Sequence, residues 1–184
     1  MRFVLHYRGP LRSNGNPSHK HELRRAFHQQ LKTLWDAPPL NEQLNLLKPR
    51  RQGAYSLLRP FESFIFVPLV TAEMNVLAAV TVTMLRAEPP GNLVTQGGDI
   101  DNRLKTLFDA LTVPRHLNAL PAGIAPAADE SPFFCLLEDD NLITSIGVNT
   151  EQLLEPGIDS SIVDLYIEVV TRVTRHTMGN MSFS

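Results

Sequence analysis

The sequence has little cysteine and no long apolar run. Its single thiol, Cys135, cannot form an internal disulfide or a cysteine-based zinc site, and such cysteine usage is typical of the reducing cytoplasm. The most apolar stretch, residues 76–85, spans about ten residues and contains threonine, whereas a membrane-spanning helix needs roughly 20. Residues 1–12 carry arginine and histidine throughout and lack the apolar centre of a signal peptide. We therefore expect a cytoplasmic protein without membrane association.

Three common functional motifs are also missing. There is no Walker-type phosphate loop, and no serine flanked by glycines as a hydrolase nucleophile would be. The acidic run that starts at Asp99 is not a calcium loop, because Leu104 stands where that loop requires glycine. These absences exclude the phosphate-loop, serine-hydrolase and EF-hand classes.

Charge is distributed unevenly along the chain, although the net charge is only −2. Residues 1–60 hold eleven Lys and Arg against three Asp and Glu, a balance of +8, and the remainder holds six against sixteen, a balance of −10. One interpretation is a face that binds a polyanion beside a carboxylate site. The other is an uneven but merely solvated surface.

The pattern of apolar residues predicts an α+β fold, with a mixed β-sheet packed against two main helices. The first helix, which Ser18 would cap, carries the apolar stripe Leu23, Phe27, Leu31, Leu34 and Trp35. We interpret residues 1–184 as one domain with irregular insertions near 40–59 and 114–132. The predicted strands cover residues 2–7, 61–69, 76–86, 133–137, 142–148 and 162–173, and the predicted helices cover 18–35 and 101–111.

The start of the second helix is the most informative segment. Two glycines precede Asp99 and Asp101, so the chain can turn sharply and bring the two carboxylates together where the helix begins. Within the helix, Asp101, Lys105 and Asp109 follow at intervals of four and share one stripe. The simpler interpretation is that Asp101 caps the helix and that Asp109 pairs with Lys105.

A second acidic feature, residues 138–140, follows the apolar run 133–137. Carboxylates from two segments supply the hard oxygen ligands that Mg²⁺ prefers, with room for water and phosphate oxygens. Carboxylates held close together repel one another unless a cation neutralises them. The alternative is a solvated acidic turn. In the same way, His19, His21 and His28 are transition-metal ligands, surface histidines near phosphate or ordinary histidines, and we favour the last of these.

These segments resemble the RusA-type Holliday junction resolvases. The family pattern is Asp-x-Asp-Asn-x-x-Lys, then Asp-Ala-Leu, then a Leu-Asp-Asp turn after a strand, and it matches residues 99–111 closely and 137–140 moderately. The resemblance implies an endodeoxyribonuclease of recombination or repair, with a RusA-like fold, Mg²⁺ or Mn²⁺, a homodimer and paired nicks in four-way junctions. It assigns catalytic roles to Asp99, Asp101, Lys105 and Asp140, and metal binding to Asp99, Asp101, Asp139 and Asp140.

Basic residues provide candidate contacts to the DNA backbone, which would position the substrate without reading its sequence. The long strands 76–86 and 162–173 are candidates for a dimer interface. Two other functions stay open: a DNA-structure-binding or regulatory protein with weak or no cleavage, and a Mg²⁺-dependent phosphohydrolase acting on small substrates. The candidate DNA contacts are Lys20, Arg24, Arg25, Lys32, Lys48, Arg50, Arg51 and Arg103.

Overall fold

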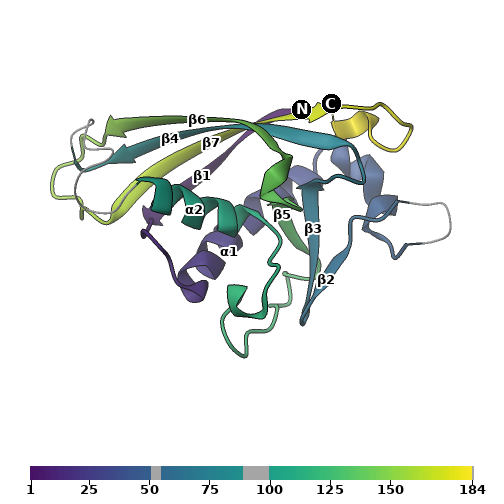
Figure 1. The fold of residues 1–184 in the computed structure, drawn as a ribbon, viewed down its shortest axis with the longest axis horizontal. Coiled ribbons are helices and arrows are strands. Elements are labelled where there is room, and N and C mark those ends of the chain that lie inside the picture. Colours follow the sequence, from purple (N-terminus) through teal and green to yellow (C-terminus); the bar gives the residue numbers. More distant parts are fainter. Residues whose placement is uncertain (51–54, 89–99, 184) are drawn as a thin grey trace.

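Two sheets and two α-helices form the fold in a computed structural model, which describes residues 1–50, 55–88 and 100–183. The predicted α+β class is confirmed. The strands divide into a four-stranded and a three-stranded sheet, and each sheet is mixed, with both parallel and antiparallel pairs. Figure 1 shows α1 and α2 beneath the four-stranded sheet, with the three-stranded sheet beside them at one end.

The four-stranded sheet has the order β1-β7-β4-β6. Strand β7 pairs antiparallel with both β1 and β4, while β6 runs parallel to β4. Because β4 and β7 are internal strands, neither has a free edge, so the sequence-based idea that they meet a second chain cannot apply to their edges. The four strands are β1 (Arg2–Pro10), β4 (Val76–Arg86), β6 (Ile143–Gln152) and β7 (Ile162–Val173).

One face of this sheet is buried against the helices. Alternate residues of β4 are buried, and they pair in register with alternate buried residues of β7, as in the pairs Val82 with Ile167 and Val80 with Val169. This period-two burial is what a sheet with one covered face requires. The opposite face, which we call the outer face, presents exposed residues such as Tyr166 and Arg172.

The three-stranded sheet has the order β2-β3-β5 and positions the acidic turn. Its last strand, β5, is buried along its length and ends directly before Glu138. A bridge between Thr112 and Leu137 ties the end of α2 to the end of β5, so the helix and the turn are held side by side. The elements are β2 (Arg59–Phe61), β3 (Phe64–Val70), β5 (Phe133–Leu137) and α2 (Ile100–Leu111).

Helix α1 (Pro17–Trp35) buries its apolar stripe under the four-stranded sheet. Asn16, not the predicted Ser18, caps the helix, because the Asn16 side chain accepts a hydrogen bond from the His19 amide at 2.9 Å. Gln30 covers the free edge of β1: its amide nitrogen donates to the His6 carbonyl and its oxygen accepts from the His6 amide. The helix therefore shields an edge strand as well as the core.

The connections contain more structure than the sequence predicted. Residues Leu40–Leu47 form a short 3₁₀ helix, and further 3₁₀ turns occur at Leu117–Ala119, Asp140–Leu142 and Met181–Phe183. Strand β2 was not expected, because it is only three residues long and contains a proline. Within the described residues, no helix is both long and apolar enough to span a bilayer.

Candidate functional site

The polar stripe of α2 stays accessible. Asp101 and Lys105 are exposed and Asp109 is partly buried, while Leu107, Ala110 and Leu111 point into the core. This is the separation of stripes that the spacing predicted. The proposed partner of Asp109 was wrong, however: its carboxylate accepts from Lys20 Nζ of α1 at 2.6 Å rather than pairing with Lys105.

The two aspartates of the turn after β5 differ in their surroundings. Asp139 caps the 3₁₀ turn, since its Oδ1 accepts from the Asn141 amide at 3.0 Å, and its Oδ2 pairs with Arg115. Both carboxylate oxygens of Asp139 are therefore engaged. Asp140 is exposed, and no hydrogen bond or ion pair to its carboxylate occurs among the described residues. Of the two predicted ligands, Asp140 is the one free to accept a cation.

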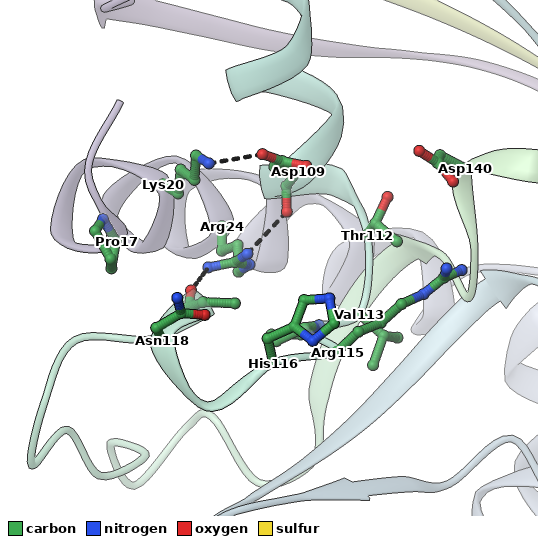
Figure 2. A pocket seen from close by; sticks show the side chains of 12 residues that line it. Pro17, Lys20, Arg24, Asp109, Thr112, Val113, Arg115, His116, Asn118 and Asp140 are labelled. Carbon is green, nitrogen blue, oxygen red and sulfur yellow. Dashed lines mark hydrogen bonds and ion pairs between the residues drawn. The ribbon is translucent and has the colours of Figure 1, made fainter. Parts of the chain in front are cut away.

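Asp109 and Asp140 stand between two clefts. One cleft, of about 430 Å³, places them with Lys105, Phe108 and Ile146, so α2 and β6 form its walls. The other, of about 360 Å³, is lined by the same two aspartates and is walled by α1 and by the chain that follows α2. Figure 2 shows Asp109 and Asp140 on the rim of this second cleft. The structure thus brings together two of the predicted site residues, Lys105 and Asp140, with Asp109 beside them.

A divalent metal would need more than the described carboxylates. No group of three or more Asp, Glu, His or Cys close enough to hold a metal exists within residues 1–50, 55–88 and 100–183. Asp99, a predicted ligand, lies outside the described residues. Asp140 nevertheless offers exposed oxygen donors beside an open cleft, which is the chemistry that Mg²⁺ accepts.

The basic side of α1 is largely covered by the segment 118–134. Arg24 is only 2% exposed, and its guanidinium donates to the carbonyls of Ala119 and Asp109, at 3.0 and 2.8 Å. Burial lowers the pKa of Arg24 to about 10. The prediction that Arg24 is a surface contact for DNA is therefore wrong, because its hydrogen-bond donors are turned inward.

The other predicted DNA contacts of α1 are also engaged. Arg25 forms a two-pronged ion pair with the carboxylate of Glu130, at 2.6 and 3.1 Å. Lys32 is partly exposed and donates to the Asp129 carbonyl at 3.2 Å. These contacts hold the segment 118–134 against the helix, so they have a structural role whether or not DNA also binds.

Of the remaining predicted contacts, Lys48, Arg50 and Arg103 do not line the clefts around Asp140. Lys48 is exposed, and Arg50 is paired with Glu73 at 3.4 Å. Arg51 lies outside the described residues. Arg103 is buried and donates to the Leu11 carbonyl at 2.9 Å, so it ties α2 to the chain after β1 instead of facing solvent.

Two histidines of α1 belong to the core. His21 is buried between the rings of Phe64 and Phe133, and neither of its ring nitrogens has a hydrogen-bond partner. Burial, with Arg25 and Arg24 nearby, lowers the pKa of His21 to about 4. His28 accepts from the Phe134 amide at 2.8 Å. The interpretation of these residues as ordinary, neutral histidines agrees with their burial.

Sequence reasoning missed several residues of the second cleft. Arg115, His116 and Asn118 line it, and they come from the segment interpreted as an irregular insertion. No spacing pattern marks them, because they follow one another in a loop and face the cleft through its local path. Glu138 was grouped with the acidic turn, but it points away to bind Arg59 at 2.5 Å and the Ala72 amide at 3.1 Å.

Comparisons of the chain with family models, with curated proteins and with solved structures found no match. The resemblance to the RusA-type resolvases consequently rests on the motifs in residues 99–111 and 137–140, and the function derived from it is a proposal.

Proposed function

We propose that this chain is a Mg²⁺-dependent endodeoxyribonuclease that hydrolyses phosphodiester bonds in branched DNA, in the manner of a Holliday junction resolvase. The observation that carries the proposal is the meeting of two motifs far apart in sequence. Lys105 and Asp109 of α2 share a cleft with Asp140 of the turn after β5. A carboxylate pair beside an accessible lysine suits a phosphate whose negative charge grows during the reaction.

Asp101 and Asp140, together with Asp99, would hold Mg²⁺, or Mn²⁺ in its place. When bound, such an ion polarises a phosphoryl oxygen and lowers the pKa of a water molecule. Lys105 is exposed on the same stripe of α2, and it would stabilise the negative charge on the phosphate oxygens. The ion pair of Lys20 with Asp109 fixes the position of Asp109 between the two clefts.

The proposal includes a homodimer acting in the cytoplasm. A four-way junction has two strands to cut, related by a two-fold axis, and one chain carries one set of the proposed carboxylates. A symmetric dimer would supply the second set. Light scattering at micromolar concentration, with and without junction DNA, tests this part, and a strict monomer in both conditions would exclude symmetric cutting.

A second function has one observation in its favour. Asp139 is occupied by Arg115, and Asp109 by Lys20, so two of the acidic groups are already neutralised by the chain itself. A protein that binds branched DNA without cutting it would need no metal and could keep these ion pairs. Asp140 and Lys105, by contrast, are both exposed beside one cleft and form no ion pair among the described residues, and this favours the nuclease.

The deciding experiment uses the full chain with labelled four-way, flap, single-stranded and duplex DNA, each with Mg²⁺, Mn²⁺ or EDTA. The proposal predicts cleavage of branched DNA with either metal and none in EDTA. Tight binding of branched DNA without cleavage in any metal would favour the second function. Cleavage in EDTA would contradict a metal-dependent reaction.

A further inference from the structure

The second cleft has a composition that the reaction at Asp140 does not explain. Its walls come from three separate segments: Lys20 and Arg24 from α1, Asp109 from α2, and the chain from Thr112 to Ala119. Figure 2 shows His116 and Asn118 on the wall opposite Lys20. Asp140 at the rim also lines the neighbouring cleft of Lys105. The two clefts are therefore adjacent, and a ligand in one lies beside the candidate site.

One buried cation of this cleft, Arg24, has no carboxylate partner among the described residues. Lys20 and Arg115 have carboxylate partners, but Arg24 donates only to two uncharged carbonyls, and its Nε has no partner. A nearly buried cation without a counter-ion is costly, and a bound anion would reduce that cost. Counted with Asp139, the partner of Arg115, the cleft has three cations and three carboxylates, so the argument for an anion rests on Arg24 and not on an excess of positive charge.

The other lining groups suit a nucleoside. His116 and Asn118 are exposed, and they can stack on a base or bind its edge through hydrogen bonds. Pro17, Val113 and Pro114 provide an apolar surface for a base or sugar. A volume of about 360 Å³ is at the lower end of small-ligand pockets, so it accommodates a single nucleotide and not a base pair.

We propose that this cleft binds one unstacked nucleotide of a DNA strand, with its phosphate toward Lys20 and its base against His116 and Asn118. This inference rests on the proposed nuclease function, because it concerns the DNA that the nuclease would cut. It narrows the substrate to DNA with an unpaired nucleotide at the branch, since a stacked base pair cannot enter and extrusion has an energetic cost. The segment 114–132 would then be a substrate-selecting element.

The test is binding of a mononucleotide to the full chain in EDTA, where a metal-dependent nuclease cannot act. Amide NMR spectra would be recorded during titration with dAMP, with deoxyadenosine and with inorganic phosphate. We expect dAMP to shift the amides of residues 112–119 and to bind at least about fivefold more tightly than either part alone. Equal binding of phosphate and dAMP, or shifts elsewhere only, would overturn the proposal.

Variants locate the site. His116→Ala removes an exposed loop side chain, so the fold should be unaffected, and it should weaken dAMP binding at least about fivefold. Lys20→Met should weaken dAMP and phosphate alike. Arg172→Met removes an exposed cation from the outer face of the sheet and should leave the affinity within about twofold. Unchanged affinity in a folded His116→Ala variant would overturn the assignment.

Competition identifies the source of the nucleotide. A single-stranded pentanucleotide should displace dAMP, and a blunt hairpin duplex should not; equal displacement by both would contradict the single-nucleotide cleft. A pentanucleotide that fails to compete would contradict a strand as the ligand and point to a free nucleotide. All of these binding measurements are made in EDTA, so they do not depend on cleavage. Binding of dAMP without any DNA cleavage in Mg²⁺ would contradict the proposed nuclease function alone. Cleavage in Mg²⁺ without dAMP binding would contradict the proposed nucleotide site alone.

Discussion

Helices α1 and α2 look alike in sequence but differ in what covers their polar residues. Each has an apolar stripe facing the core and a charged stripe beside it. On α2, Asp101 and Lys105 remain exposed, whereas on α1, Arg24 and His28 are buried. The difference shows that a charged stripe stays accessible only where no other part of the chain packs on it.

The covering element of α1 is the segment 118–134, and its contacts are specific. Glu130 binds Arg25, the Asp129 carboxylate accepts from Gln29, and the Phe134 amide donates to His28. These are interactions across about 100 residues of sequence. The surplus of positive charge in the first third of the chain therefore stabilises the fold in part, and it is a weaker argument for DNA than the sequence indicated.

The largest expected effect concerns the exposed stripe of α2. Asp101→Asn removes a proposed metal-binding charge, so cleavage of branched DNA should fall at least about a hundredfold, more than loss of an outer-shell partner causes. Binding should be equal or tighter, because a charge that repels phosphate is also lost. Single-turnover cleavage and gel-shift assays measure the two quantities. A wild-type rate would mean that Asp101 serves only the start of the helix.

Removing a charged residue from the covered stripe of α1 should lower the free energy of unfolding. Arg25→Ala leaves the Glu130 carboxylate, which is 5% exposed, with only the Ala127 amide as a partner. Because Arg25 itself is partly exposed, we expect a loss of about 2 kcal/mol in the free energy of unfolding instead of the full cost of breaking a buried pair. Urea denaturation measures it. Arg172→Ala, the exposed control, should stay within about 0.5 kcal/mol, and an equal loss in both variants would contradict the account.

The buried histidine of α1 predicts a pH dependence of stability. The pKa of His21 is lowered to about 4 in the folded chain and is about 6.5 when unfolded, so the unfolded state binds the proton first. The stabilisation is present above pH 6.5 and is lost as the pH falls toward 4. Between about pH 7.5 and about pH 5, the wild type should lose roughly 2 kcal/mol more than His21→Leu. Equal losses of stability in the wild type and in His21→Leu would show that burial does not keep His21 from binding a proton.

The smallest effect tests whether α1 touches DNA at all. Lys32 is the partly exposed member of the predicted contacts on this helix that has no carboxylate partner among the described residues. If it contacts a phosphate, Lys32→Met should reduce the slope of log affinity against log salt by about 0.9 on duplex DNA. Fluorescence anisotropy over a salt series measures the slope. No change relative to Arg172→Met would place this side of α1 away from the DNA.

The strands and helices could be predicted because the residue patterns that indicate them lie within each segment. The bounds of β4, β5 and β7 agree with the apolar and β-branched runs in the sequence, and α2 begins within one residue of its expected start. The sequence predicted that carboxylates of α2 and of the turn at Asp140 would meet, but not the contact that brings them together. That contact is the pairing of Thr112 with Leu137, which no periodicity reveals.

The rest could not be predicted because it depends on distant partners. Arg24 and Lys32 are eight residues apart on one helix, and only the packing of the segment 118–134 makes one buried and the other accessible. Likewise, adjacent Asp139 and Asp140 are identical in type. Their difference arises from Arg115, whose approach depends on the path of an irregular loop.

That difference between Asp139 and Asp140 provides the most direct test of the account. The measurement is the single-turnover rate of junction cleavage in Mg²⁺ for Asp140→Asn and Asp139→Asn, with folding checked by thermal unfolding. We predict a loss of at least about a hundredfold for Asp140→Asn, as for loss of a metal ligand, and a loss below about tenfold for Asp139→Asn, whose oxygens bind Arg115 and the Asn141 amide. Equal rates for Asp140→Asn and the wild type would contradict the proposed site.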